Sequence, residues 1–262
     1  MPSILDSKCI LVTGATAGIG RALALEIAKL PSKPKVIGSG RRQDRLDQLS
    51  EAGIEGMQLD VNADRETLKK FVDNLVNKNP DLDTIVLCAG IQRQFNFQKE
   101  VDLDAISLEF NVNYFSVVTT ITYLIPHFVR LAATGRKCSI ITVTSALSVI
   151  PMPLVPNYCA TKAALHSYTM SLRAQLQSAN IHVAEIVPPL VESELHDAEG
   201  TTERLSKFWM PLDEFTNTVM EGLKKGDTVV AAGNAKTHYE QFEQPKEAIF
   251  AQTTKALLQN LN

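Results

Sequence analysis

Residues 9–20 of the chain read CILVTGATAGIG, in which a run of five mostly apolar residues enters a turn with three glycines. The run predicts a buried strand, and the residues after the turn show the apolar spacing of a helix that ends before Pro31. A glycine-rich turn between them lets backbone N–H groups approach a pyrophosphate at the positive end of the helix. The stretch therefore predicts a dinucleotide-binding unit, with a plain structural turn as the alternative. The spacing of Gly14, Gly18 and Gly20 differs from the usual G-x-G-x-x-G fingerprint.

The alternation of strand and helix continues along the chain. Continuous apolar runs such as residues 84–88 suit strands that are buried on both faces. The expected strands are 8–13, 35–39, 56–60, 83–88, 137–144, 181–187 and 227–232, and the expected helices are 18–30, 42–51, 64–78, 104–133, 157–178 and 211–224. This pattern predicts an α/β fold with a Rossmann-like, doubly wound parallel sheet of about seven strands and helices on both faces.

No Ser/Gly-rich linker divides the chain, so residues 1–262 are expected to form a single dinucleotide-binding domain. An amphipathic helix and a tail are expected from His238 onward.

Tyr158 and Lys162 are four residues apart in the expected helix 157–178, and Ser145 precedes them. Residues at this spacing share a helix face, so the ammonium of Lys162 can lie beside the phenol of Tyr158. A nearby cation in a partly dry cleft is expected to lower the pKa of Tyr158 from its usual value of about 10. Such a phenol can exchange a proton near pH 7 while Ser145 orients a substrate oxygen. The alternative is an ordinary half-buried helix face.

Six motifs follow one another along nearly all of the chain. Residues 13–20 form the glycine-rich motif, Asp60-Val61 follows the third strand, Ala89-Gly90 follows the fourth, and Asn113 opens the segment 113–117; Ser145, Tyr158 and Lys162 follow, and then Pro188 to Ser193. In this order and spacing the chain resembles the short-chain dehydrogenase/reductase family.

The resemblance implies that Asn113, Ser145, Tyr158 and Lys162 form a catalytic tetrad, in which Asn113 ties Lys162 to a chain of water molecules. Lys162 would also hold the ribose of a nicotinamide cofactor. The cofactor-binding residues, including two chosen below from the second strand, are predicted to be Gly14, Thr16, Gly18, Ile19, Gly20, Ser39, Arg41, Asp60, Val61, Ala89, Gly90, Tyr158, Lys162, Pro188, Val191 and Ser193. Family members often pair through the two long helices, so a homodimer or homotetramer is expected.

Three positions depart from the family pattern. Leu87 and Cys88 replace two asparagines, Ser116 replaces a glycine after Asn113, and Pro189 replaces the glycine after Pro188. The first change removes side-chain hydrogen bonds on the adenosine side of the cofactor. Proline forbids positive φ and lacks an N–H, so we expect a stiffer entrance to the substrate loop.

Residues 36–42, at the end of the second strand, decide the expected cofactor. An NAD enzyme needs an acidic residue there to bind the ribose 2′-hydroxyl, and none is present. A guanidinium suits a 2′-phosphate, so Ser39 and Arg41 predict NADP(H). One of Arg41 and Arg42 is expected to lie in solvent, and Asp44 is a candidate counter-ion that would weaken the preference.

Composition excludes several other classes. A net charge of −3 with scattered basic residues gives no reason to expect nucleic acid. Four cysteines without C-x-x-C spacing predict reduced thiols, and five dispersed histidines predict no metal site; His166 is expected at the surface or in packing. Residues 138–161 are uncharged, but their polar residues and three prolines argue against a membrane span. We expect a cytoplasmic protein.

Apolar side chains between Ser145 and Tyr158 and in an expected lid, residues 190–210, suggest the walls of a substrate pocket. They are Leu147, Val149, Ile150, Met152, Leu154, Val155, Leu195, Phe208 and Trp209, with Phe95 and Phe97 after the fourth strand and Gln92, Arg93 and Gln94 at the rim. The sequence thus predicts an NADP(H)-dependent oxidoreductase, a carbonyl reductase that interconverts a carbonyl and an alcohol on a small apolar or aromatic substrate. A non-catalytic NADP(H)-sensing protein and a dehydratase or epimerase on the same scaffold stay open as alternatives.

Overall fold

Seven parallel strands form one sheet in the computed structural model of the chain, which describes residues 2–258. The strands are β1 (Cys9–Thr13), β2 (Lys35–Gly40), β3 (Glu55–Gln58), β4 (Leu82–Leu87), β5 (Cys138–Val143), β6 (Ile181–Val187) and β7 (Val229–Ala231). Their order is β3-β2-β1-β4-β5-β6-β7, so the chain returns to pair β4 with β1 after building outward to β3. This reversal confirms the doubly wound sheet and opens a crevice beyond the ends of β1 and β4.

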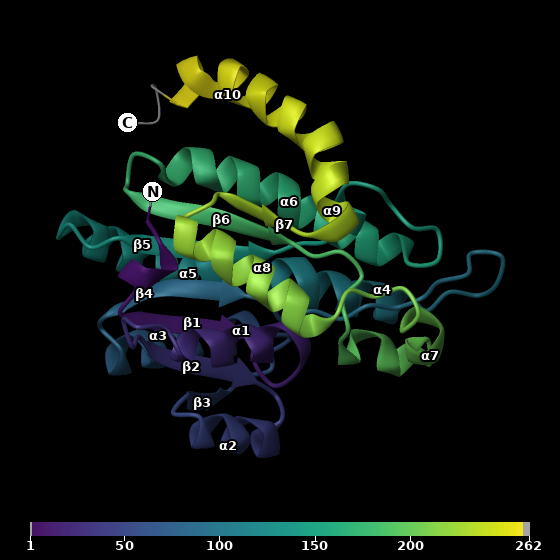
Figure 1. Cartoon of the computed structure of the whole chain (residues 1–262), viewed down its shortest axis with the longest axis horizontal. Helices are drawn as coiled ribbons and strands as arrows, with labels where there is room; N and C mark the ends of the chain where they lie inside the picture. Colours follow the sequence, from purple (N-terminus) through teal and green to yellow (C-terminus); the bar gives the residue numbers. More distant parts are fainter. Residues whose placement is uncertain (1, 259–262) are drawn as a thin grey trace.

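Helices cover both faces of the sheet. They are α1 (Gly18–Ala28), α2 (Gln43–Glu51), α3 (Arg65–Lys78), α4 (Leu103–Phe110), α5 (Ser116–Ala133), α6 (Pro156–Leu176), α7 (Thr202–Leu205), α8 (Leu212–Lys225), α9 (Gly233–His238) and α10 (Gln244–Leu258). In Figure 1 the strand arrows point toward the side of the molecule on which α4 and α7 lie. The expected helices are confirmed. The structure adds short helices in the lid and a C-terminal helical segment that is longer than expected.

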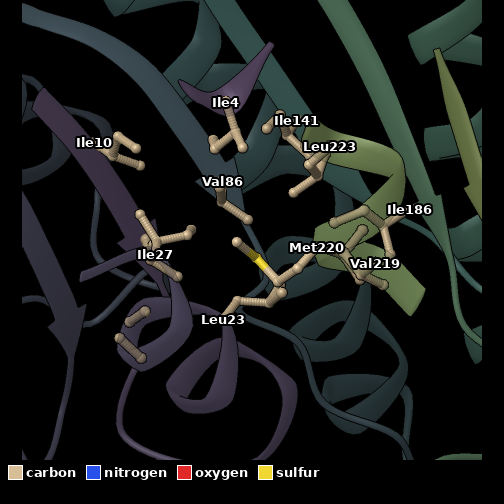
Figure 2. Packing of buried hydrophobic residues seen from close by; sticks show 14 of the residues in the cluster. Ile4, Ile10, Leu23, Ile27, Val86, Ile141, Ile186, Val219, Met220 and Leu223 are labelled. Carbon is tan, nitrogen blue, oxygen red and sulfur yellow. The ribbon is translucent and has the colours of Figure 1, made fainter. Parts of the chain in front are cut away.

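Two large apolar clusters lie on opposite faces of the sheet. On one face, α1 and α8 pack together, and Figure 2 shows Leu23 of α1 beside Met220 of α8, close to Val86 of β4. On the other face, α3, α5 and α6 contribute residues such as Phe128, which is fully buried. Both faces are therefore dry, which explains why the strands read as unbroken apolar runs.

A single long helical segment, Leu103–Ala133, joins α4 and α5 through a π-helical turn, η2 (Asn111–Phe115). By length and composition this segment could cross a membrane. One of its faces packs on the sheet through Val117, Ile121 and Phe128, as in the core helix of a globular protein. Its apolar character is thus accounted for by the fold.

The C-terminal segment begins earlier than predicted, at Gly233 rather than His238, and continues through the π-helical turn η5 (Tyr239–Glu243) into α10. Gly233 has a φ of +51°, so glycine suits this start. In Figure 1, α10 runs beside α6 at the β7 edge of the sheet.

His166 of α6 anchors this segment, and of the two expected positions, at the surface or in packing, the structure shows the packed one. The buried imidazole donates through Nδ1 to Glu185 at 2.9 Å and through Nε2 to Glu243 at 2.9 Å. Because both ring nitrogens face carboxylates, these contacts favour the protonated, charged form of the imidazole. Burial alone would lower the pKa of His166, but hydrogen bonds and charges from Glu185 and Glu243 outweigh it and raise the pKa. The Glu243 carboxylate also pairs with Lys246.

Candidate active site

The predicted site residues gather at one edge of the sheet. Gly14 follows β1, Asp60 lies just beyond β3, Gly90 follows β4 and Ser145 follows β5. Because the strands are parallel, their carboxyl ends meet along this edge, where ligands bind in open α/β sheets.

The glycine-rich turn is packed so closely that side chains would not fit. Gly14 has a φ of +69°, and a Cβ there would lie 2.9 Å from the amide nitrogen of Ala89. A Cβ on Gly20, in the first turn of α1, would collide with the carbonyl of Gly14. A Cβ on Gly18 would lie 3.1 Å from Cβ of Ser193 at the start of the lid. Bare backbone at the start of a helix suits the pyrophosphate of a dinucleotide.

The Thr13 side chain, at the end of β1, is hydrogen-bonded to the segment after β4. Its hydroxyl oxygen accepts hydrogen bonds from the backbone N–H groups of Cys88 (3.0 Å) and Ala89 (3.2 Å). The segment after β4 is therefore held against the glycine turn through main-chain atoms. Burial raises the pKa of the Cys88 thiol to about 11, so this side chain is a neutral group in the cleft.

Asn113 lies in the π-helical turn η2 and is fully buried. Its side-chain oxygen accepts from the backbone N–H of Ile91 at 2.9 Å, and its amide donates to the carbonyl of Ile91 at 2.9 Å and to the Thr161 hydroxyl at 3.1 Å. The asparagine therefore ties the loop after β4 to α6, the helix that carries Tyr158. A π turn inside an α-helix is a common feature of functional sites.

Tyr158 and Lys162 are both buried on α6 and lie together as the spacing predicts. The Lys162 Nζ lies 5.6 Å from the centre of the Tyr158 ring and donates to the carbonyl of Val143 at 2.9 Å. The Ser145 side chain is close enough to Tyr158 to lower the pKa of the phenol, although burial has the larger, opposite effect, and its Oγ accepts from the backbone N–H of Leu147 at 3.1 Å. Three members of the expected tetrad thus lie together, and Asn113 is joined to the same helix through the Thr161 hydroxyl.

The expectation of an acidified phenol is wrong for the cofactor-free chain. Burial raises the pKa of Tyr158, and the hydrogen bond with Ser145 offsets only part of this effect. Burial also lowers the pKa of Lys162 to about 8. A dry site penalises both charged forms at once, because removal from water costs more than the partners return. The phenol is therefore held protonated at neutral pH.

Glu109 was missed by sequence reasoning. This fully buried carboxylate of α4 accepts from the backbone N–H of Arg93 at 2.8 Å and from the side-chain amide of Asn157 at 2.6 Å. It thereby holds the loop after β4 against the residue that precedes Tyr158. Burial raises the pKa of Glu109 despite these hydrogen bonds. A glutamate between Leu108 and Phe110 in an apolar stretch was the available signal.

At the end of β2 the structure favours a different arginine from the one predicted. Both arginines are exposed, but Arg42 donates to the hydroxyl of Thr16 in the glycine turn at 3.2 Å, whereas the contact of Arg41 is through its carbonyl, which accepts from Gln58. Ser39 is fully buried, and its hydroxyl has no hydrogen-bond partner among residues 2–258. Asp44 approaches Arg45, at 3.9 Å, and not Arg42.

The remaining predicted contacts frame the cleft. The Asp60 carboxylate accepts from the backbone N–H of Asn62 at 2.9 Å in an exposed turn, beside half-buried Val61. The Pro188 carbonyl accepts from the backbone N–H of Ala146 at 2.7 Å, so the strand ends β5 and β6 are joined next to Ser145. The ring atoms of Pro189 lie close to Gly233, so the start of the substrate loop lies next to α9.

The lid predicted at residues 190–210 is a helical flap closed at its base by pairing of Val191 with Met210. It contains a 3₁₀ segment, η4 (Glu194–Glu199), and α7. Two contacts join η4 to the loop after β4: Arg93 lies 3.3 Å from Glu199, and His196 lies 3.1 Å from the side-chain oxygen of Gln92. These two contacts hold η4 against the loop after β4.

Apolar residues expected in the pocket divide into two groups. Val155 is buried with Tyr158 and Cys159, and Leu147 and Leu195 pack against them. The others are exposed, namely Phe97, Ile150, Met152, Leu154 and Phe208. Phe95 donates its backbone N–H to the carbonyl of Leu154 at 3.2 Å, so two of these rim segments are adjacent.

All four cysteines are free thiols, as predicted. Within residues 2–258 the structure brings together no group of three or more His, Cys, Asp or Glu side chains that could hold a metal ion.

Comparison with known proteins places the chain among oxidoreductases. A family model described as short chain dehydrogenase matches residues 8–204. The uncharacterized oxidoreductase DltE of Bacillus subtilis (strain 168) is 32% identical over 227 residues, which cover 85% of this chain and 86% of that protein.

Solved structures show the same fold at lower identity. A short-chain dehydrogenase from Sphingobium yanoikuyae in complex with NADPH matches with a TM-score of 0.79 at 20% identity, covering 93% of this chain and 95% of that one. A short chain dehydrogenase/reductase from Burkholderia phymatum in complex with NAD matches with a TM-score of 0.76 at 19% identity, covering 88% and 90%.

Proposed function

Because this chain belongs to the short-chain dehydrogenase/reductase family and is an oxidoreductase that binds a nicotinamide cofactor, we propose that it uses NADP(H) to interconvert a carbonyl and an alcohol. The observation that carries the proposal is the meeting of Tyr158, Lys162 and Ser145 beside the glycine-rich turn. Its substrate would be a small apolar or aromatic molecule.

In the proposed mechanism, bound NADPH supplies the hydride. Ser145 orients the carbonyl oxygen, and Tyr158 donates the proton that this oxygen takes up. A protonated phenol is the form needed for reduction, and burial of Tyr158 favours that form. Lys162, fixed by the Val143 carbonyl, places a positive charge beside the ring and stabilises the phenolate left behind. Asn113 is hydrogen-bonded to Ile91 and to Thr161, and so holds the loop after β4 against α6.

The proposed preference for NADP(H) is supported by charge at the end of β2. Arg42 reaches the glycine turn, and no acidic residue precedes it in residues 36–42. The two structural neighbours named above hold NADPH and NAD respectively, so they do not favour either cofactor. The choice therefore rests on Arg42 and Arg45.

The apolar surroundings of Tyr158 support an apolar substrate. Val155, Leu147 and Leu195 pack around Tyr158, and a charged phosphorylated sugar would lose part of its hydration against these apolar side chains. Exposed Phe97, Met152 and Phe208 extend this character to the rim.

A panel of ketones and aldehydes assayed with NADPH and NADH in parallel tests the proposal, with the oxidation of NADPH followed by absorbance. We expect turnover with NADPH, and we expect Tyr158→Phe to reduce turnover by about 10²-fold or more while NADPH still binds. Binding without turnover across the panel would instead support a sensing protein. Conversion of a substrate without net use of NADPH would support a dehydratase or an epimerase.

We also propose that the protein works as a homodimer or homotetramer in the cytoplasm. Phe115 and Val129, at 52% and 42% exposure, lie on the long helical segment that pairs subunits in the expected assembly. Light scattering coupled to size-exclusion chromatography should give at least twice 28.8 kDa, and a monomer mass would contradict the assembly.

A further inference from the structure

Glu194, the first residue of η4 in the lid, bridges two arginines at the far side of the cleft. Its Oε2 accepts from Nη1 of Arg42 at 2.6 Å, and its Oε1 lies 3.5 Å from Nη1 of Arg45. Each of its two carboxylate oxygens therefore faces a different guanidinium. The three side chains are between 36% and 43% exposed, so water and ions can reach the cluster.

The bridge crosses the surface on which a dinucleotide would lie. Arg42 contacts Thr16 with its other terminal nitrogen, and Ser193, which precedes Glu194, lies against Gly18. Thr16 and Gly18 both belong to the glycine turn. Glu194 thus lies at the point where the glycine turn meets the end of β2, which is where a ribose 2′ substituent would be read.

A carboxylate between two guanidinium groups resembles the arrangement that binds a phosphate monoester. Both anions accept paired, charge-assisted hydrogen bonds from the planar fork of arginine. We propose that Glu194 occupies the position of the cofactor 2′-phosphate, so that the lid and the phosphate compete for Arg42 and Arg45. This inference rests on the proposed use of NADP(H).

Such competition makes Glu194 a specificity-determining residue. A bound 2′-phosphate must displace the carboxylate or suffer its repulsion, whereas a plain 2′-hydroxyl leaves the ion pair intact and can donate a hydrogen bond to it. Glu194 therefore reduces the preference for NADP(H) that the two arginines create. It plays the part that the sequence suggested for Asp44, and it does so from the lid.

Two cofactor fragments isolate the effect, namely 2′,5′-ADP, which carries the extra phosphate, and 5′-AMP, which lacks it. Calorimetry should show that Glu194→Gln increases the ratio of their affinities by about threefold to fivefold, the range of an exposed ion pair. The matched control is Glu199→Gln, which removes the same charge from the other end of η4, where the partner is Arg93. This control should leave the ratio unchanged.

Arg42→Ala distinguishes failure of the proposed competition by Glu194 from failure of the proposed use of NADP(H). It should reduce the affinity ratio, and adding Glu194→Gln to it should have less effect than in the wild type. If Arg42→Ala reduces the ratio while Glu194→Gln and Glu199→Gln act alike, the competition is refuted and the NADP(H) assignment stands. If the wild type binds both fragments equally and Arg42→Ala changes nothing, the NADP(H) assignment fails as well.

Trp209, the single tryptophan of the chain, provides a second readout in the lid. Because Glu194 anchors η4, its displacement by 2′,5′-ADP should change the fluorescence of Trp209, and 5′-AMP should not. Equal responses to the two fragments would also refute the competition. The adenosine fragments lack the nicotinamide chromophore, so quenching by energy transfer does not interfere.

Discussion

Replacing Lys162 with methionine should make the cofactor-free protein more stable at neutral pH. The pKa of the buried amine falls from 10.5 to about 8, and a difference of 10.5 − 8, or 2.5 units, corresponds to about 3 kcal/mol. Methionine removes this penalty and fills a similar volume, but it loses the hydrogen bond to the Val143 carbonyl, which is worth about 1 kcal/mol. The expected net gain at pH 7 is therefore about 2 kcal/mol.

The pH dependence of this gain identifies its cause. Below pH 8 the lysine is protonated in both the folded and unfolded states, so the penalty is present in full. Between pH 8 and 10.5 the unfolded chain binds more protons, so the wild type gains stability with rising pH while the variant does not. Between pH 8 and 10.5 the free energy of unfolding of the wild type should therefore rise by about 3 kcal/mol relative to that of the variant.

Urea unfolding of both proteins at several pH values from 7 to 10 measures the difference. Lys207→Met, at an exposed lysine of the lid, controls for the change in net charge. A difference that stays constant with pH, or that favours the wild type at pH 7, would refute the idea that burial of the amine is costly. The variant should also lose turnover, as expected where a functional group is kept at the expense of stability.

Further predictions concern the glycine-rich turn, the buried contacts of His166, and Ser39 at the end of β2. Gly20→Ala should weaken NADPH binding at least about tenfold, since its Cβ would force the Gly14 carbonyl to move; fluorescence titration of NADPH tests this. His166→Gln should lower the free energy of unfolding by about 3 kcal/mol in acid. The raised pKa makes this loss greatest below pH 6.5 and smaller as pH rises through the folded value, and a loss that grows with pH would contradict the charged imidazole. Ser39→Ala should raise the free energy of unfolding by about 1 kcal/mol, because the buried hydroxyl has no hydrogen-bond partner among residues 2–258. Urea unfolding measures this change, and a lower free energy of unfolding in the variant would contradict the prediction.

The fold followed from local patterns because its central strands are buried on both faces. Runs such as residues 84–88 have no polar alternation, and the strand ends lie within a few residues of their predicted positions. The start of the C-terminal segment was misplaced because its anchor is tertiary. Gly233 lies close to Pro189, and Glu243 is hydrogen-bonded to His166. Both partners are distant in the sequence.

The site was predictable where spacing within one helix sets the geometry, as for Tyr158 and Lys162. The electrostatic prediction failed because burial depends on the whole fold, and desolvation raises the pKa of Tyr158 by more than the hydrogen bond with Ser145 lowers it. The role of Glu194 was equally out of reach, since its partner Arg42 is 152 residues away along the chain. Long-range pairing of surface charges leaves no periodic signal.

The π-helical turn at Asn111–Phe115 also sets the register of everything that follows it. One extra residue in a single turn rotates the rest of the helix by about 100° relative to a regular α-helix. If one residue were deleted there, either Asn113 would swing away from Ile91, or Val117 and Ile121 would leave the sheet. This stretch should therefore tolerate exchanges of side chain far better than any change in its length.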